Sequence, residues 1–387
     1  MIRKKTRRRA AAGNKPVRFR LLPDPPVNHA ARILRLRTLA HELDSAWTLI
    51  NNPLDVAYLT GFLGGDSYLL LGPSGCTVIS DFRYDEELRP VRKLADIHIR
   101  KGAMPAAVGD AFAANDIRRC LIQPEYVTLN EKDALTRHIG EGRSLIPAPG
   151  LVQKMRLIKD AAEVHFIRQA ARIQEAALLA ILPTLAPGQT ELEVAGRLEA
   201  EMKARGSREP GFQTIIAART NGSLPHYRPE GVTLARNQPL LIDWGAVYLG
   251  YHSDMTRTFS FGKWPAKVRE IYQIVLDAQL AAAAALAPGK STRQIDAVAR
   301  DYIIKHGYGE AFGHGLGHGL GFNGHEEPRL THMLAESTLQ PGQVVTVEPG
   351  IYLPGIGGVR IEDDYLITDK GAENLCTLPK DLAWATL

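Results

Sequence analysis

The first 150 residues contain short apolar runs that alternate with stretches of helical periodicity. Apolar side chains recur at helical spacing in residues 28–43. Strand and helix patterns then follow in turn: strands at 47–50, 68–71, 77–80, 97–99 and 120–123, and helices near 105–114 and 130–139. This alternation predicts a small α/β domain over residues 23–150, with a turn at residues 51–53 and a linker at 147–150.

The rest of the chain, residues 151–387, begins with two helical patterns and then repeats them. Asp160 and Thr190 each stand three residues before a glutamate, the spacing of a capping box at a helix start. PGQT at residues 187–190 is echoed 101 residues later by PGKST at 288–292, and each lies between an apolar helix and a second helix. This period is too long for a solenoid repeat. We therefore predict one duplicated helix–helix–sheet unit.

The first copy leads into an apolar hairpin at residues 240–259, with a turn at 248–250. Each strand carries one acid, Asp243 or Asp254. If the hairpin is centred between residues 248 and 249, the two carboxylates lie opposite each other, where like charges repel. The pattern therefore predicts either bound metal ions or a shared proton between them.

The second copy leads through a segment rich in glycine and histidine, residues 312–327, into a second hairpin at residues 344–367. This hairpin turns near residues 354–355 and carries Glu348 and Glu362. Two strand pairs with two acids each are what a fold with pseudo-twofold symmetry needs to enclose a site at its axis.

Composition and charge limit the classes of protein to which this chain can belong. The hydrophobic content of 45% and the charged content of 23% are ordinary for a soluble globular protein. Nine Lys or Arg residues fall within residues 1–20, so the net charge of +5 belongs to a basic tail over residues 1–22 that we predict to be disordered. We find no signal peptide pattern and no apolar run long enough to span a bilayer. The three sparse cysteines lack CxxC spacing and indicate a reducing cytoplasm.

The acids of the two hairpins and one histidine form a candidate metal site: Asp243, Asp254, His318, Glu348 and Glu362. A set rich in carboxylates suits Mn²⁺ best, with Co²⁺ or Zn²⁺ as alternatives. Four carboxylates cannot cluster in their ionised form without about two divalent charges to offset them. The sequence therefore predicts two divalent metal ions per chain.

Six motifs carry a resemblance to a known family: HYRP at 226–229, DxGA with YxGYxSDMTRT at 243–258, GHGxGH at 313–318, HExP at 325–328, EPGIY at 348–352 and GVRIEDD at 358–364. The sequence resembles the pita-bread metallopeptidases, specifically the proline-peptidase branch with aminopeptidase P and prolidase. YLTGF at 58–62 and DFRY at 81–84 resemble that branch's amino-terminal domain. The resemblance implies an α+β fold, with a pita-bread catalytic domain over residues 151–387 after a smaller, creatinase-like α/β domain.

The resemblance also implies how the five side chains divide between two metal ions. Asp243 would bind one ion, His318 and Glu348 the other, and Asp254 and Glu362 would bridge both. A water between the ions would lose its proton near neutral pH and attack the scissile carbonyl. Glu348 would then carry that proton to the leaving nitrogen.

Further residues take catalytic roles by the same resemblance. His226 and His325 would hydrogen-bond the substrate or the intermediate. His314 stands where the family has a histidine that contacts the substrate, although a conformational role is the alternative. Arg360 could hold a substrate carboxylate or tether a bridging acid, and Thr256 shares a face with Asp254 and is a candidate partner for the metal ligands.

The implied activity is exopeptidase cleavage of the Xaa-Pro bond, either at the amino terminus of peptides or in Xaa-Pro dipeptides. The expected partners are a proline-containing peptide and a second copy of the chain in a homodimer, without a membrane. We expect no nucleic acid binding beyond nonspecific contact by the basic tail. Two alternatives remain open: a creatinase-like C–N hydrolase, and a noncatalytic pita-bread module that binds another macromolecule.

Overall fold

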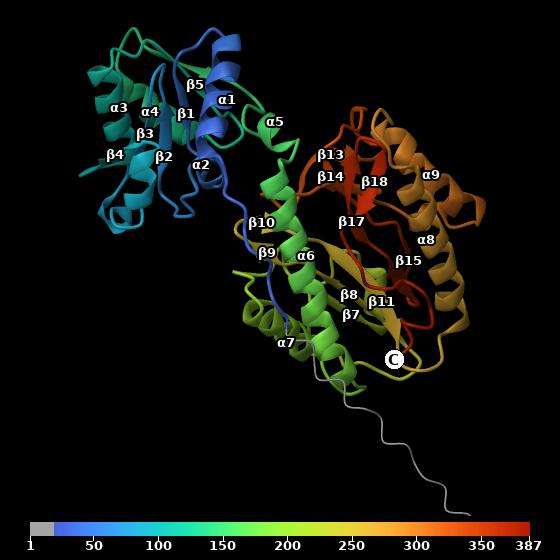
Figure 1. The fold of residues 1–387 in the computed structure, drawn as a ribbon. Helices are drawn as coiled ribbons and strands as arrows, with labels where there is room; N and C mark the ends of the chain where they lie inside the picture. The colour runs from blue at the N-terminus through green and yellow to red at the C-terminus, as the bar shows by residue number, and fades with distance from the viewer. Residues whose placement is uncertain (1–18) are drawn as a thin grey trace, which may run out of the picture.

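The computed structural model describes residues 19–387, so most of the predicted basic tail lies outside the described residues. A smaller amino-terminal domain sits at one end of a larger carboxyl-terminal domain, and a short helix joins them (Figure 1). Residues 19–22, which the prediction included in the tail, lie along the first long helix of the larger domain. There, Arg172 donates a hydrogen bond to the Arg20 carbonyl. No helix among residues 19–387 is long and apolar enough to cross a membrane.

The amino-terminal domain is a six-stranded mixed sheet between two pairs of helices. Its strands are β1 (Thr48–Ile50), β2 (Tyr68–Leu71), β3 (Cys76–Ser80), β4 (Asp96–Ile99), β5 (Arg119–Ile122) and β6 (Ser144–Pro147), in the order β4-β3-β2-β1-β5-β6. Its helices are α1 (His29–Glu42), α2 (Pro53–Thr60), α3 (Met104–Ala114) and α4 (Leu129–Ile139). Apolar side chains of α1 and α2 pack on one face of the sheet, and those of α3 and α4 pack on the other.

Helix α2 differs from the sequence prediction, which placed only a turn at residues 51–53. The Asn52 side chain caps the helix by accepting a hydrogen bond from the backbone of Leu54, and Pro53 is the first helical residue. Six of its eight residues are buried, so the helix has no polar face. An apolar helix this short cannot be told from a buried loop by periodicity, which explains why the pattern did not reveal it.

The carboxyl-terminal domain contains five helices and twelve strands among the described residues. The helices are α5 (Gln153–Arg156), α6 (Ala161–Ile181), α7 (Glu191–Ala204), α8 (Ala266–Ala285) and α9 (Thr292–Lys305). The strands of the first half are β7 (Ile215–Ala218), β8 (Pro239–Trp244), β9 (Val247–Tyr248), β10 (Tyr251–His252) and β11 (Met255–Ser260). The strands of the second half are β12 (Gly317–Gly319), β13 (Glu326–Leu330), β14 (Val344–Val347), β15 (Gly350–Leu353), β16 (Gly357–Arg360), β17 (Asp363–Thr368) and β18 (Gly371–Asn374).

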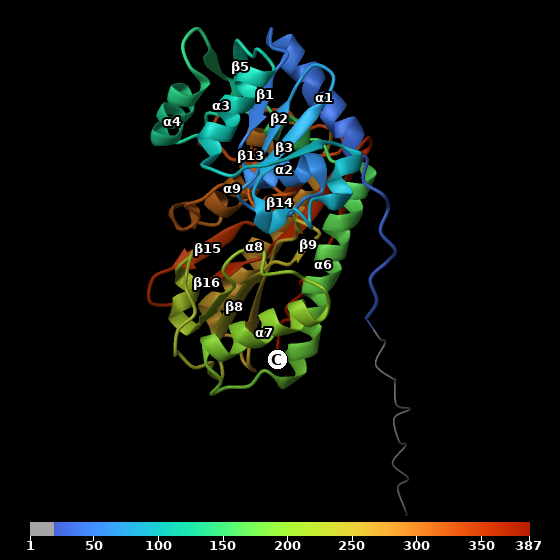
Figure 2. The ribbon, with the colours of Figure 1, turned by 90° about the vertical axis from the view of Figure 1, so that its left-hand side faces the viewer.

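The two halves repeat one arrangement, as the sequence predicted. Helices α6 and α7 precede the sheet β11-β8-β7, and α8 and α9 precede the sheet β13-β12-β14-β17-β18. In each half a long hairpin carries a smaller hairpin at its tip, β9/β10 or β15/β16. The predicted capping boxes at Asp160 and Thr190 are present, and Ser291 forms a third at the start of α9. The pita-bread fold is thereby confirmed, with both sheets between α6 and α7 on one side and α8 and α9 on the other (Figure 1), and with α7 in front of β8 in Figure 2.

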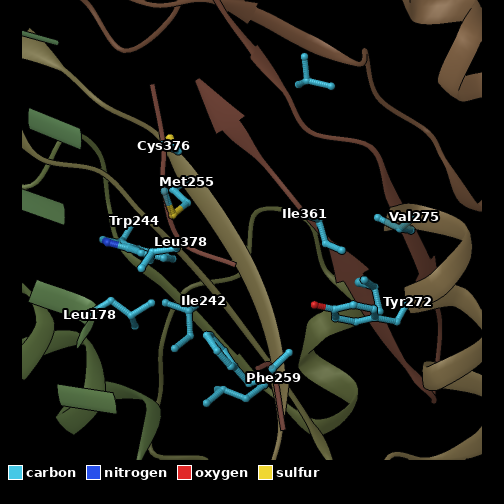
Figure 3. Packing of buried hydrophobic residues seen from close by; sticks show 14 of the residues in the cluster. Leu178, Ile242, Trp244, Met255, Phe259, Tyr272, Val275, Ile361, Cys376 and Leu378 are labelled. Carbon is cyan, nitrogen blue, oxygen red and sulfur yellow. The ribbon is translucent and has the colours of Figure 1, made fainter. Parts of the chain in front are cut away.

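The core of this domain lies between the helices and the two sheets. Figure 3 shows Leu178 of α6 beside Ile242 of β8, and Tyr272 of α8 beside Ile361 near the start of β17. All four side chains are buried. Helices α6 and α8 thus pack against the strands that lead to the acidic residues. This packing fixes those strands, so the core sets the geometry of the site.

A second apolar cluster crosses from one domain to the other. The ring of Phe322 makes edge-to-face contacts with Tyr58 of α2 and with Tyr251 of β10, at centroid distances of 6.2 and 4.9 Å. Beside this cluster, Arg156 of α5 donates to Asp55 of α2 at 2.8 Å and to Glu326 of β13. The domains are therefore joined by both apolar packing and buried ion pairs.

Candidate functional site

The hairpin that carries Asp243 and Asp254 has a different register from the predicted one. Asp243 of β8 lies opposite Thr256 of β11, and the pairing of β9 with β10 continues this register to a two-residue turn at Leu249 and Gly250. Both turn residues have positive φ, 49° and 87°. The prediction that the two aspartates face each other across the strands was wrong, because the hairpin is centred one residue later than expected.

The five predicted ligands nevertheless lie together. Ligand atoms of Asp243, Asp254 and Glu362 are all within 4.8 Å of one another, and so are those of His318, Glu348 and Glu362. Glu362 belongs to both groups, so the groups form one continuous site. Each half of the duplicated fold supplies part of it, since the two aspartates come from the first hairpin and the other ligands from the second copy.

The four carboxyl groups are mostly removed from water and close to one another. Asp243, Asp254 and Glu362 are buried, and Glu348 is partly buried. Burial raises the pKa of each group, for Glu348 to about 8, and repulsion from neighbouring acids raises the pKa values of Asp254 and Glu362 further. Nearby cations would favour the ionised form of all four groups. The donor set therefore fits divalent metal ions.

His318 is oriented as a neutral metal ligand. Its Nδ1 lies 3.0 Å from the Gly319 carbonyl, which places the proton on Nδ1. Its Nε2 faces the carboxylates, 3.4 Å from Glu348 and 3.7 Å from Asp254. Burial lowers the pKa of His318 to about 3, so the ring is neutral near pH 7 and the Nε2 lone pair points into the acidic cluster. Within the same cluster, the buried Oδ1 of Asp243 has no hydrogen-bond partner among residues 19–387, as expected for an atom that binds a cation.

All three nitrogens of the Arg360 guanidinium donate hydrogen bonds to protein atoms within the site. Its Nη2 donates to Asp243 Oδ2 at 2.5 Å and its Nε donates to Thr256 Oγ1 at 3.0 Å. Thr256 in turn donates to Glu362 Oε2 at 2.6 Å, as a partner of the ligands would. The remaining Nη1 donates to the Tyr352 hydroxyl at 2.8 Å. Of the two roles predicted for Arg360, the contacts favour the tether of a bridging acid, although Arg360 reaches Glu362 only through Thr256 and its direct contact is with Asp243.

His314 is held at the edge of the cluster by a chain of hydrogen bonds. The Tyr352 hydroxyl, which accepts from Arg360, lies 2.9 Å from His314 Nε2. The Nδ1 of His314 lies 2.8 Å from the Gly315 carbonyl, so Nδ1 carries the proton and Nε2 accepts from the tyrosine. Burial lowers the pKa of His314 to about 4, which keeps the ring neutral.

The backbone around His314 is fixed from helix α9. Arg300 donates to the carbonyls of Phe312 and His314, at 2.9 and 2.6 Å. Asp296 pairs with Arg300 and accepts a hydrogen bond from the backbone of Leu316 at 3.0 Å. The second helix of this half therefore positions the segment that carries His314 and His318.

A cavity of about 690 Å³ opens onto the cluster. His226 and His325 lie on its wall, both exposed, and the His325 ring centroid is 4.0 Å from that of His318. The walls also include four apolar side chains, Phe212, Ile215, Met333 and Leu334. Every residue for which the sequence predicted a catalytic or metal-binding role lines this one cavity or its base.

Comparison with known proteins decides the family. Residues 165–369 match metallopeptidase family M24, and residues 32–158 match the Creatinase/Prolidase N-terminal domain. The chain belongs to family M24. This M24 peptidase is 36% identical over 351 residues to an uncharacterised peptidase of Bacillus subtilis, an alignment that covers 91% of this chain and 99% of the relative.

Two solved structures similar to this M24 peptidase are those of enzymes named for Xaa-Pro substrates. An Xaa-Pro dipeptidase from Bacillus anthracis has a TM-score of 0.88 at 37% identity, over 92% of this chain and 99% of the other. An X-Pro aminopeptidase from Thermotoga maritima has a TM-score of 0.82 at 33% identity, over 89% and 99%. The sequence-based recognition of the pita-bread metallopeptidases is thus confirmed.

Two residues at the site of this M24 peptidase were missed by the sequence reasoning. Tyr352 links Arg360 to His314, and it is the last residue of the EPGIY motif. Asp364 is fully buried and accepts a hydrogen bond from the backbone of Asp254 at 3.0 Å. It follows Glu362 by two positions, and the strand period of two would have placed it on the same face.

Proposed function

We propose that this M24 peptidase hydrolyses the bond between an amino-terminal residue and a following proline, and that it does so with two divalent metal ions. The observation that carries the proposal is the pair of overlapping ligand groups that share Glu362, with His226, His314 and His325 on the wall of the same cavity. The Xaa-Pro dipeptidase and X-Pro aminopeptidase with similar structures support the choice of substrate.

The ligands divide between the two ions as the resemblance implies. Asp243 would hold one ion, His318 and Glu348 would hold the other, and Asp254 and Glu362 would contact both. Bound there, the ions would polarise the scissile carbonyl and lower the pKa of a water molecule. We propose Mn²⁺ as the physiological metal because carboxylate oxygens outnumber the single imidazole.

The surrounding residues bind the substrate and move its proton. Glu348 takes a proton from the attacking water and delivers it to the proline nitrogen, which must be protonated to leave. His226 and His325 face the reacting carbonyl from the cavity wall and stabilise the negative charge that develops on its oxygen. Arg360 fixes the orientation of Asp243 through a 2.5 Å hydrogen bond.

Removal of metal tests the proposal. Protein stripped with a chelator is expected to lose Xaa-Pro hydrolysis and to regain it on addition of Mn²⁺ or Co²⁺, with about two ions bound per chain. Activity against Ala-Pro and the metal content by mass spectrometry should be measured on the same samples. Full activity without metal would contradict the proposal, and absence of bound metal after reconstitution would favour a noncatalytic module. Faster turnover of creatine than of Ala-Pro would favour a C–N hydrolase.

A series of substrates of increasing length distinguishes dipeptidase from aminopeptidase activity. Arg228 and Arg329 also line the cavity, and the Arg329 side chain is one-third exposed, with its only ion pair among the described residues at 3.9 Å to Glu327. Such a guanidinium is available to a substrate carboxylate, which only a dipeptide places next to the reacting bond. We therefore expect kcat/KM to be higher for Ala-Pro than for Ala-Pro-Pro-Ala. The opposite order would indicate an open channel and an aminopeptidase.

The proposal also includes the cellular compartment and the oligomeric state. We place the enzyme in the cytoplasm as a homodimer. Three buried cysteines without disulfides are typical of a reducing compartment. Size-exclusion chromatography with light scattering measures the oligomeric state directly.

A further inference from the structure

Glu191, the first residue of helix α7, is a buried acid that none of the predicted roles includes. It is fully buried. Its two oxygens accept four hydrogen bonds: from the backbone of Ala218 at 2.7 Å, Asn221 Nδ2 at 3.0 Å, the Tyr227 hydroxyl at 2.8 Å and the backbone of Glu230 at 3.1 Å. No Lys or Arg among residues 19–387 forms an ion pair with it, so its hydrogen-bonding partners are neutral donors.

The four donors lie on both sides of His226. Ala218 and Asn221 precede it, and Tyr227 and Glu230 follow it, within one loop of thirteen residues. The His226 side chain itself is exposed and makes no hydrogen bond to any of the described residues. Its position over the cavity is therefore set by the loop backbone, which is held by the four hydrogen bonds to Glu191 and by one from Arg360 to the Pro225 carbonyl at 3.4 Å.

Only a carboxylate satisfies this set of contacts. Two backbone N–H groups and an amide NH₂ can only donate, so both oxygens of residue 191 must accept. Burial raises the pKa of the Tyr227 phenol, and its hydrogen bond to Glu191 adds to this effect, which keeps the phenol a donor. The amino end of α7 also favours negative charge. A glutamine at position 191 would place its NH₂ group, which can only donate, against neighbouring groups that also donate.

The other half of the duplicated fold has no acid at the equivalent position. Thr190 and Ser291 cap equivalent helices and form equivalent bridges, with Thr233 and Thr338. The residue equivalent to Glu191 is therefore Thr292, also fully buried, and its hydroxyl accepts one hydrogen bond, from the backbone of Ser337 at 3.1 Å. In that half a single neutral acceptor, the Thr292 hydroxyl, is enough to hold the loop. The additional contacts made by Glu191 are specific to the half that carries His226.

We propose that Glu191 is a positioning residue that holds the His226 loop at the reacting bond. The inference rests on the proposed function, because His226 contacts the substrate only if the cavity is the active site. Glu191 touches neither substrate nor metal ligands. It acts through the loop at residues 218–230, and its loss should matter only while His226 is present.

A double-mutant cycle tests this dependence. Glu191→Gln is expected to lower kcat/KM for Ala-Pro about 10- to 100-fold, the usual cost of leaving buried polar groups unsatisfied, with most of the loss in kcat. In a His226→Ala background the same change should cost less than about 3-fold, because the residue that it positions is gone. Glu193→Gln, in the exposed capping box of the same helix, is the matched control and should leave kcat/KM unchanged. Equal losses from Glu191→Gln in both backgrounds would overturn the proposal.

Hydrogen exchange of the metal-free protein gives a readout that is independent of activity. Glu191→Gln should speed exchange in residues 218–230, and Glu193→Gln should not. Unchanged exchange would overturn the positioning role even if activity fell. A wild-type protein without Xaa-Pro hydrolysis would instead overturn the proposed function, while faster exchange in Glu191→Gln would still support the structural part of the inference. If Glu191→Gln does not fold, Tyr227→Phe removes one of the four hydrogen bonds and should give a smaller loss with the same dependence on His226.

Discussion

Asp254→Asn is expected to abolish hydrolysis of Ala-Pro and to remove both metal ions. A carboxylate oxygen of Asp254 lies within 4.8 Å of carboxylate oxygens of Asp243 and Glu362, and another such set joins Asp254 to ring nitrogens of His318 and His325, so Asp254 reaches both sides of the site. Asparagine has the same shape but lacks the charge that offsets two cations. We expect a loss of kcat/KM on the order of 1000-fold or more, the effect of several kcal/mol of lost transition-state stabilisation.

Asp243→Asn provides the comparison, because Asp243 belongs to only one of the ligand groups. Asp243→Asn should weaken the binding of one ion and leave the other ion bound. Asp110→Asn on α3, an exposed site without a hydrogen bond from its side chain to other described residues, is the neutral control. Metal content per chain and titration calorimetry measure the effect. An Asp254→Asn protein that retains two ions would show that Asp254 is not shared between them.

Arg156→Met is expected to destabilise the protein by about 3–5 kcal/mol, the cost of breaking a buried ion pair from one side. Arg156 is buried, its Nη1 donates to Asp55 at 2.8 Å, and its Nη2 and Nε donate to Glu326. The change leaves the buried Asp55 carboxylate without a cation, while Lys159 still pairs with Glu326 at 3.3 Å. Because Glu326 follows His325 directly, activity should fall as well.

Urea unfolding of the Arg156→Met protein measures the loss of stability. Adding Asp55→Asn in the same chain should recover part of it, since the uncompensated charge is then removed. Arg89→Met breaks an exposed pair with Glu86 and should cost less than about 1 kcal/mol. If Arg156→Met cost no more than Arg89→Met, the pairs of Arg156 would not join the domains.

The sequence located the candidate site because its chemistry is concentrated in residue types and motif order. Four acids on two duplicated hairpins, with a histidine in the segment that leads into the second hairpin, were enough to predict one cluster. The register of the first hairpin was not predictable in the same way, because Leu249 adopts a left-handed conformation that leucine rarely takes. Nothing in the residue type marks that turn position. The wrong register did not affect the prediction of one cluster, because Glu362 comes from the other half of the fold.

Contacts over long sequence separations explain most of what the sequence could not provide. The partner of Arg360 is Asp243, 117 residues earlier, and the donors to Glu191 lie 27 to 39 residues after it. In the sequence Glu191 looks like an ordinary acid in the first turn of a helix. Only the folded loop shows that four donors converge on it. Helix α2 was missed for a local reason, because a buried helix of eight residues has no polar face.

The apolar cluster between the domains has a consequence for how substrate exchanges with the cavity. Hinge bending would have to separate Tyr58 from Phe322 and break the contacts of Arg156 with its acids. Domains joined by a buried apolar interface do not open readily. Ligands would therefore reach the cavity through motion of the loops at its mouth. The segment at residues 331–338 is such a loop, because Met333 and Leu334 line the cavity and residues 332–338 are exposed, whereas the loop at residues 218–230 is held by Glu191.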